Sequence, residues 1–232
     1  MSERPEQTFS LQVAIELACA AERANGGYIK ESEIFNLTPS TSPDFKYPNK
    51  ELIMIAIGAR HVKAYEDIAV KPVLLCTNLE DRDRATEMRK YFKRLMFSAI
   101  EGEDQFRTDL YSVLEKEEIA KNKMGFIAYL PFAYQKEKYG QAVKKADNGY
   151  LADVGTELLD LDCEVLRTNR SKNYDAWNID AIINNKLVSW MSKNQVKIGP
   201  CVLIKGKVKD HSKHWQHPEV DVTRLNYVKV FQ

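Results

Sequence analysis

The sequence predicts an α+β protein, with a mainly helical N-terminal region over residues 1–148 and a five-stranded β-barrel over residues 150–232. Two observations support this fold class. Apolar residues recur at helical spacing through most of the first region, and they alternate with polar residues in five short runs within about 80 residues of the second. Between the two patterns, residues 146–150 (ADNGY) carry a turn signal, which predicts the domain junction there.

Three segments of the N-terminal region predict helices, because their apolar residues recur every three or four positions. The first begins at Ser10, a residue type that caps helix N-termini, and ends before Gly26, which favours a helix C-terminus. The other two are longer apolar stripes with charged residues on the opposite face. The predicted helices cover residues 10–25, 80–100 and 104–120.

In the rest of the N-terminal region the hydrophobic pattern does not distinguish helix from strand as clearly. Residues 36–50 are rich in proline and hydroxyl side chains and predict a loop. Residues 51–59 form an apolar run that fits a buried helix or a strand, and residues 70–77 are similar, with Pro72 favouring a sheet edge or a turn. Residues 119–145 interleave lysines with aromatic rings, so they fit either an amphipathic element packed on the barrel or a second wall of its binding groove.

The C-terminal region predicts five strands. The first strand has apolar residues alternating with acidic ones, which indicates one dry and one wet face. The apolar residues, expected to face the core, are Leu159, Leu161, Cys163 and Val165, and the acidic ones are Asp160, Asp162 and Glu164. An Asn-Asn pair at residues 184–185 predicts a tight hairpin turn. The number and spacing of the strands are typical of the oligonucleotide-binding (OB) fold. The strands are predicted over residues 159–165, 174–183, 187–191, 201–209 and 220–231.

Charge is distributed unevenly along a chain whose net charge is only +1. Residues 167–232 contain 12 basic and 5 acidic side chains, whereas the preceding part contains 22 basic and 28 acidic ones. This separation predicts one face for a polyanion and another face for a different partner. The hydrophobic fraction of 44% is enough for a folded core, and the chain lacks the long apolar run that a membrane span needs.

The start of the chain lacks the apolar core of a signal peptide, which predicts an intracellular protein. Its cysteines are isolated, so we expect reduced and mostly buried thiols, with a bond between Cys163 and Cys201 as the less favoured alternative. The four cysteines are Cys19, Cys76, Cys163 and Cys201.

Two segments of the C-terminal region, residues 204–210 (IKGKVKD) and 222–230 (VTRLNYVKV), resemble the last two strands of OB-like domains in bacteriophage replication proteins. Residues 174–191 fit the central hairpin of the same pattern, so the resemblance covers residues 155–232. The whole arrangement, a helical part before a barrel, is similar to a family of single-stranded-DNA-binding proteins from lytic podoviruses that encode their own polymerases. That resemblance implies a protein that coats single strands, serves as cofactor of a phage RNA polymerase, and works in the cytoplasm of the infected bacterial host.

Basic side chains of the C-terminal region are the first candidates for phosphate contacts. Lys205, Lys207 and Lys209 occupy alternate positions of one predicted strand, which would place their ammonium groups on one face about 6.6 Å apart. Further lysines and arginines lie in the predicted loop after the first strand, a place where OB folds hold ligands, and near the last two strands. These additional candidates are Arg167, Arg170, Lys172, Lys213 and Arg224.

Aromatic rings of the same region are candidates for base stacking, an interaction that single-strand binders use. Trp215 lies in a polar loop, where burial is difficult to achieve, and it is favoured for stacking together with Tyr174. Tyr227 is a further candidate. Trp190 fits stacking or core packing equally, and Trp177 is in phase with core positions of its strand.

Two other patterns have a chemical interpretation. Three carboxylates on the first strand would suit a two-metal nuclease, although alternating acids are ordinary on a wet strand face. Three histidines recur every third residue, but structural zinc sites usually add cysteine and none is near. With no nucleotide-binding, hydrolase or zinc-protease motif, we expect no enzyme activity, no cofactor and no metal. These residues are Asp160, Asp162, Glu164, His211, His214 and His217.

The sequence therefore predicts a sequence-nonspecific single-stranded-DNA-binding protein that acts in phage transcription or replication. Single-stranded DNA is its expected partner, and self-association along the strand is compatible with this role. The alternative is a protein-interaction module that recruits a phage RNA or DNA polymerase, with DNA contact secondary. The acidic excess of the first 166 residues favours that alternative.

Overall fold

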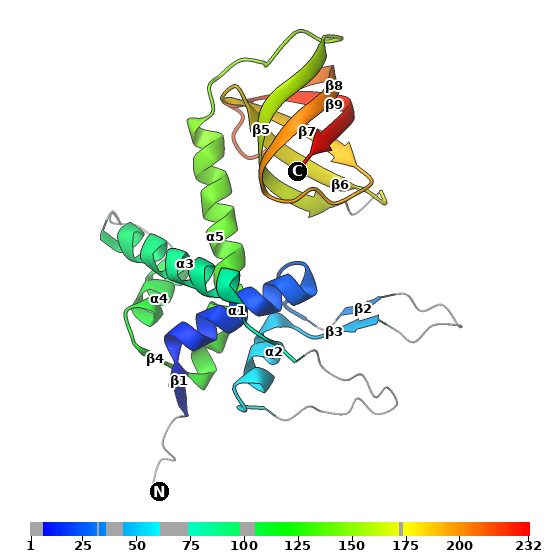
Figure 1. The fold of residues 1–232 in the computed structure, drawn as a ribbon. Coiled ribbons are helices and arrows are strands. Elements are labelled where there is room, and N and C mark those ends of the chain that lie inside the picture. The colour runs from blue at the N-terminus through cyan, green and yellow to red at the C-terminus, as the bar shows by residue number, and fades with distance from the viewer. Residues whose placement is uncertain (1–6, 32, 36–43, 61–73, 98–104, 172–173) are drawn as a thin grey trace, which may run out of the picture. The chain divides into compact units, whose positions relative to one another are not determined.

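The computed structural model confirms the predicted α+β class, with a helical first part followed by a β-barrel (Figure 1). Contacts divide the chain into two compact units, Met1–Tyr134 and Gln135–Gln232, which are described separately below. No helix among the described residues combines the length and apolarity needed to cross a bilayer. The structure describes residues 7–31, 33–35, 44–60, 74–97, 105–171 and 174–232.

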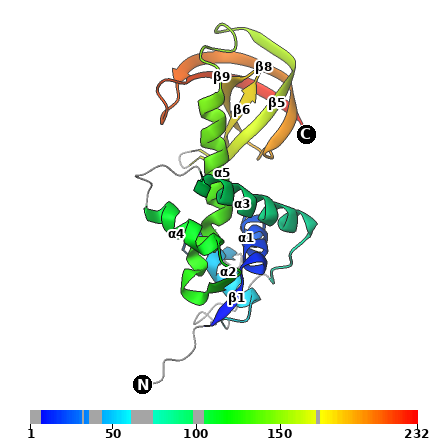
Figure 2. The ribbon, with the colours of Figure 1, turned by 90° about the vertical axis from the view of Figure 1, so that its left-hand side faces the viewer.

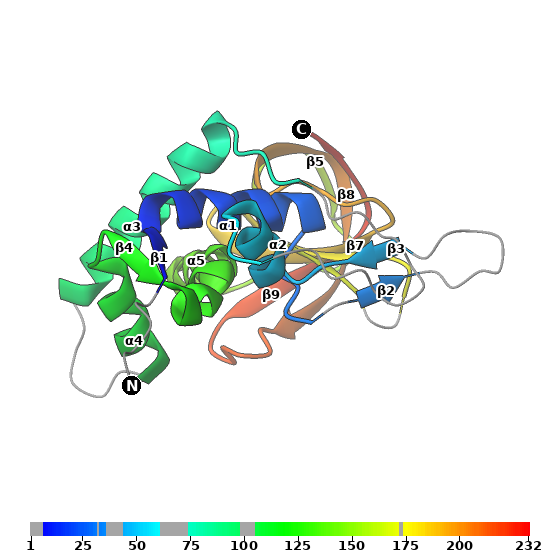
Figure 3. The ribbon, with the colours of Figure 1, turned by 90° about the horizontal axis from the view of Figure 1, so that it is seen from below.

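The first unit is built around α1 (Leu11–Asn25), which lies between α3 (Leu79–Phe97) and α2 (Asn49–Ala56) (Figure 2, Figure 3). Ser10 caps the start of α1, because its side chain accepts a hydrogen bond from a backbone N–H of the first turn. Gly26 ends the helix in the left-handed conformation, with a φ of 70°. Both helix boundaries are therefore those that the sequence predicted.

Small side chains allow α1 to sit in the centre of this unit. Ala14, Ala18 and Ala21 are completely buried, as are the longer side chains on the same face of the helix. Two ion pairs link α1 to α3 at the edge of the core, Arg23 with Asp81 at 2.7 Å and Glu22 with Arg84 at 2.6 Å. The core of the first unit thus depends on close packing of α1.

Short elements complete the first unit. The helix α4 (Gln105–Leu114) contacts α3. Two antiparallel pairs of short strands are present. The first joins distant parts of the chain, β1 (Thr8–Ser10) with β4 (Glu118–Ala120), and the second joins β2 (Glu33–Phe35) with β3 (Asp44–Lys46). The pairing of β1 with β4 brings the start of α1 next to the segment that follows α4.

The predicted helix over residues 10–25 is confirmed as α1, and the helix predicted over residues 80–100 is confirmed as α3 up to Phe97, whereas residues 98–100 lie outside the described residues. The helix predicted over residues 104–120 is wrong in its last part, because residues 118–120 pair with β1 instead of continuing α4. The apolar run at 51–59 is mostly helical. The loop predicted over residues 36–50 is wrong in its described part, which contains β3 and the start of α2. Residues 36–43 of that segment, and residues 70–73 of the other apolar run, lie outside the described residues.

A single long helix, α5 (Met124–Lys145), follows the short 3₁₀ turn η1 (Lys121–Lys123). Its first turns belong to the core of the first unit, whereas Tyr139 and Val143 pack against Val220 and other barrel residues of the second unit. The chain therefore divides within this helix, ahead of the junction expected from the turn signal at residues 146–150.

The second unit contains a closed barrel with strand order β5-β6-β7-β9-β8 (Figure 1, Figure 2). Strands β7 and β9 are parallel and the other neighbours are antiparallel. The hairpin turn at Asn184 and Asn185 has φ values of 48° and 60°, as a tight turn of this kind requires. The strands are β5 (Glu157–Arg170), β6 (Trp177–Ile183), β7 (Lys186–Ser192), β8 (Gly199–Lys213) and β9 (Asp221–Phe231). This is the predicted OB-like barrel.

Two non-glycine residues within the strands have left-handed backbone, and both change which side chains face the core. At Asp160 in β5, with a φ of 48°, the alternation slips, so that Leu158 is buried while Leu159 is 57% exposed. The prediction that Leu159 faces the core is therefore wrong. At Tyr227 in β9, with a φ of 53°, a bulge shifts the pairing with β8.

Candidate nucleic-acid interface

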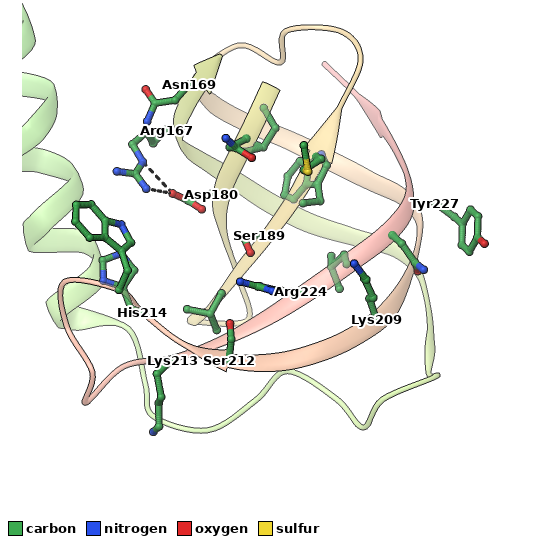
Figure 4. A pocket seen from close by; sticks show the side chains of 18 residues that line it. Arg167, Asn169, Asp180, Ser189, Lys209, Ser212, Lys213, His214, Arg224 and Tyr227 are labelled. Carbon is green, nitrogen blue, oxygen red and sulfur yellow. Dashed lines mark hydrogen bonds and ion pairs between the residues drawn. The ribbon is translucent and has the colours of Figure 1, made fainter. Parts of the chain in front are cut away.

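A groove of about 690 Å³ opens on the barrel, lined by residues from all five strands and from the loop at residues 214–220 that joins β8 to β9 (Figure 4). Its volume is in the range of ligand sites. Strands β6 and β7 are the second and third strands of the barrel. In OB folds the face of these two strands and the loop between the last two form the oligonucleotide site. The groove lies at the corresponding place.

The groove brings together most of the residues singled out from the sequence. Those that line it are Arg167, Trp190, Lys209, Lys213, Trp215, Arg224 and Tyr227. Four other predicted residues do not line it, namely Arg170, Tyr174, Lys205 and Lys207. Lys172 lies outside the described residues.

Three of the groove's four cationic side chains have carboxylate partners. Arg167 donates to Asp180, the ammonium nitrogen of Lys213 lies 2.6 Å from Asp221, and Arg224 lies 3.7 Å from Asp210. The hydrogen bond from Lys213 holds the pKa of this lysine above its usual range. Lys213 and Arg224 are each 55% exposed, and exposed ion pairs contribute at most about 1 kcal/mol, so a phosphate can compete for these two cations.

Lys209 differs from the other three cations. Within the part of the chain that the structure describes, it has no carboxylate at ion-pair distance, and its side chain is exposed. A phosphate that approached Lys209 would therefore displace only water. Among the four cations of the groove, Lys209 is therefore the one whose charge is not offset by a carboxylate of the described residues.

The three predicted lysines of β8 share one outward face, because Lys205, Lys207 and Lys209 alternate with the buried Gly206 and Val208. The pairing of β8 with β9 is irregular between Leu203 and Lys205, again between Lys205 and Lys207, and once more after Val208. The irregularities change which residues of β9 lie opposite β8, but they do not reverse the alternation of β8 side chains between residues 205 and 209. Of the three lysines only Lys209 lines the groove, while Lys205 and Lys207 pair with β5.

Two aromatic rings of the groove are highly exposed and one is not. Trp215 is 71% exposed and Tyr227 is 77% exposed, so both offer ring faces to solvent. Trp190 is only 5% exposed and belongs to the barrel core, because it occupies an inward position of β7. The suggestion that Trp190 stacks on a base is therefore not supported by its position. Tyr174 is 67% exposed but lies outside the groove lining.

The exposure of Tyr227 has a conformational cause. Its φ of 53° lies in the left-handed region, which a bulky side chain rarely adopts. The bulge places Tyr227 and Val228 opposite Gly206 of β8, where the regular ladder would place one residue. The result is that the Tyr227 ring points away from the barrel (Figure 4).

A buried hydrogen-bonded chain lies at one end of the groove. The Tyr139 hydroxyl lies 2.9 Å from Nε2 of His214 and 3.0 Å from Oδ2 of Asp180. Arg167 donates to the same carboxylate oxygen through Nε at 2.9 Å and Nη2 at 2.5 Å, as Figure 4 shows. The Arg167 guanidinium also lies over the Tyr139 ring, 4.1 Å from its centroid. Arg167 is thus held firmly at the groove wall.

Several groove residues were not singled out from the sequence. They are uncharged or acidic side chains on the outer faces of β5, β6 and β7. The polar residues of β6 alternate with Ile179 and Ala181, a pattern that marks an outer strand face but does not indicate a ligand. The residues are Asn169, Asn178, Asp180, Ser189 and Met191.

The other predicted clusters do not assemble into a metal site. Among the described residues no group of three His, Cys, Asp or Glu side chains is arranged to hold a metal ion. The His211 ring stacks on Tyr150 with 3.8 Å between the ring centroids. The rings of His214 and His217 stack on each other at 5.3 Å, and they also contact Tyr139 and Glu219 respectively. The acidic residues of β5, Asp160, Asp162 and Glu164, are all exposed, and Cys163 and Cys201 face each other across β5 and β8 as free thiols.

Comparison of the chain with protein-family models, with curated proteins and with solved structures gives no match.

Proposed function

We propose that the barrel binds single-stranded DNA, without strong sequence preference, in the groove over β6 and β7. The observation that carries this proposal is the combination of exposed rings and cations in one groove. Trp215 and Tyr227 supply the rings, and Lys209 is a cation without an acidic partner among the described residues. Grooves of this composition suit a flexible strand whose bases stack while its phosphates meet positive charge.

The proposal makes a quantitative statement about salt. Each phosphate neutralised on a single strand steepens the log–log salt dependence of affinity by about 0.7. The groove lining has four cationic side chains. If each of these cations contacts one phosphate, the slope is about −2.8. A shallower slope would mean that some cations remain paired with Asp180, Asp210 or Asp221 instead of contacting a phosphate.

Base stacking supplies the second part of the affinity. A stacked base contributes about 1–3 kcal/mol and releases no counterions, so this part is independent of salt. Stacking on Trp215 and Tyr227 gives little sequence preference, because every base has a ring face that can stack on an aromatic side chain. The amide side chains of Asn169 and Asn178 in the groove lining would add only modest discrimination.

The experiment is a salt titration of a fluorescently labelled oligo-dT strand, with duplex DNA of equal length for comparison. We expect binding of the single strand that weakens steeply with salt and weaker binding of the duplex. Lys209→Ala should reduce the slope by about 0.7, and Lys207→Ala, the matched control two residues away but outside the groove, should not. Absence of binding at low salt, or equal effects of the two variants, would contradict the proposal.

A role in phage transcription or replication is part of the same proposal and depends on the sequence resemblance of residues 155–232. A protein that coats single strands keeps them accessible to a polymerase. In this role the expected place of action is the cytoplasm of the infected host. Addition of the protein to a phage RNA polymerase on a single-stranded promoter template tests this part separately.

The second candidate, recruitment of a polymerase through the barrel, has its own supporting observation. Val202 of β8 and Phe231 of β9 are neighbours in the sheet and lie next to Asp162 of β5. Phe231 is 69% exposed, and none of these residues lines the groove. A pull-down of phage polymerase that survives Lys209→Glu but fails with Phe231→Ala would favour this function.

A further inference from the structure

His214 begins the loop that carries Trp215, and its imidazole ring accepts hydrogen bonds from backbone N–H groups of that loop. The side chain is only 5% exposed. Its Nδ1 atom accepts hydrogen bonds from the backbone N–H groups of Gln216, at 3.3 Å, and His217, at 3.1 Å. The loop is closed by the N–H of His214, which donates to the carbonyl of Val220 at 2.9 Å. The imidazole therefore replaces a backbone carbonyl in shaping this turn.

The geometry determines where the imidazole proton lies. Because two N–H groups point at Nδ1, that nitrogen carries no proton, and a neutral ring is protonated on Nε2. The Nε2–H then donates to the Tyr139 hydroxyl, and this hydroxyl donates to Asp180. Burial and the nearby Asp180 raise the pKa of Tyr139, so its hydroxyl stays protonated as this chain requires.

We propose that neutral His214 is a positioning residue, which holds the β8–β9 loop in the conformation that presents Trp215, so that single-strand binding is lost when His214 takes up a proton. This inference rests on the proposed function of the groove. A proton on Nδ1 would face the two N–H donors, both hydrogen bonds would break, and the loop would rearrange. The indole of Trp215, whose ring centroid lies 6.3 Å from that of His214, would move with it.

The groups around His214 come from every element packed on it. Tyr139 belongs to α5, Asp180 to β6 and Arg167 to β5, while His217 and Glu219 belong to the loop itself. Burial lowers the pKa of His214, and His217 and Arg167 act in the same direction against Asp180 and Glu219. The ring is therefore neutral at pH 7 and takes up its proton only below the ordinary histidine value of about 6.5.

Two effects of acid on binding have opposite signs and can be separated. A charged His214 adds positive charge to the groove, which strengthens phosphate binding, but this effect fades at high salt. Loss of Trp215 stacking weakens binding at every salt concentration. Measurement at moderately high salt therefore isolates the loop rearrangement.

The test follows Trp215 emission and oligo-dT affinity in the full-length protein as the pH falls from about 7 to about 5. We expect a change in emission that is absent from Trp215→Phe, and roughly a tenfold loss of affinity. In His214→Asn the amide oxygen can accept from the same N–H groups without titrating, so this variant should bind at pH 7 and show no pH step. His217→Gln is the matched control and should keep the step.

The results separate this inference from the proposed function. Flat emission and flat affinity in the wild type, or a step that persists in His214→Asn, would overturn the role of His214 and leave the groove proposal intact. If oligo-dT did not bind at any pH, the groove proposal would fail, while the emission of the free protein would still decide whether His214 positions the loop.

Discussion

Tyr227 offers the sharpest test of the groove, because its contributions to stability and to binding should oppose each other. The left-handed backbone at this residue costs about 1–2 kcal/mol for an ordinary side chain. The ring is 77% exposed, so it contributes little apolar burial in return. Asparagine tolerates this backbone conformation without the entropy cost of glycine. We therefore expect Tyr227→Asn to raise the free energy of unfolding by about 1 kcal/mol.

The same substitution should weaken binding. Removal of one stacking ring costs about 1–3 kcal/mol, which corresponds to roughly a 5- to 150-fold loss of affinity for oligo-dT. The loss should be the same at low and high salt, since stacking releases no counterions. A protein that becomes more stable and binds less tightly is not expected from general damage to the fold.

Stability of the barrel can be followed in the full-length protein, because all three tryptophans, Trp177, Trp190 and Trp215, lie in the second unit. Urea unfolding with tryptophan emission therefore reports on that unit. Tyr174→Asn is the matched control, since this tyrosine is also exposed but its backbone is not left-handed, and its stability should not rise. A fall in stability in Tyr227→Asn, or unchanged affinity, would refute the argument that strain at Tyr227 serves binding.

Three further outcomes follow from the barrel. Trp215→Ala should lose about 1–3 kcal/mol of oligo-dT affinity at every salt concentration, and an effect that vanishes at high salt would assign this residue a merely electrostatic role. Ile179→Ala, at a fully buried site, should lower the free energy of unfolding by about 2–5 kcal/mol, whereas Ile198→Ala, at a site 48% exposed, should change it by less than about 0.5 kcal/mol in the same urea titration. Hydrogen bonds from Lys213 and from the N–H of Gly149 lower the pKa of Asp221 in the folded protein, so its stabilising contribution is present above the ordinary aspartate value of about 3.9 and is lost as the pH falls through the lower folded value. The melting temperature of Asp221→Asn should accordingly lie below that of the wild type at pH 7, and the gap should close in acid; a gap that is constant with pH would contradict the role of the carboxylate charge.

The fold class could be predicted from the sequence because hydrophobic period is a direct consequence of secondary structure. The period of two in β6 and the Asn-Asn turn at residues 184–185 were sufficient to place the central hairpin. The end of α4 could not be predicted in this way, because residues 118–120 leave the helix to pair with β1, more than a hundred positions away in the chain. The pairing partner, and not the local pattern, decides the structure of that segment.

The candidate site was predictable in its composition but less so in its geometry. Trp215, Arg224 and Lys213, which charge and aromatic content had singled out as candidates, line one groove. Trp190 was ambiguous because periodicity alone does not say which face of a strand is the inner one. The alternation of the lysines on β8 was predictable, but which of them lines the groove was not, because that depends on the register of β8 with β5 and β9.

Both left-handed residues within the strands, Asp160 and Tyr227, break the local rules that the other strand residues obey, but they differ in what they gain. An aspartate is among the few side chains that tolerate this backbone, through local hydrogen bonds, so Asp160 needs no further explanation. A tyrosine has no such compensation, and its ring here packs little against the barrel. An unfavourable backbone conformation that no packing or hydrogen bond compensates is expected mainly at functional surfaces. For this reason Tyr227, which ordinary strand periodicity would treat as one more outward-facing residue, is the side chain whose removal tests the proposed interface most directly.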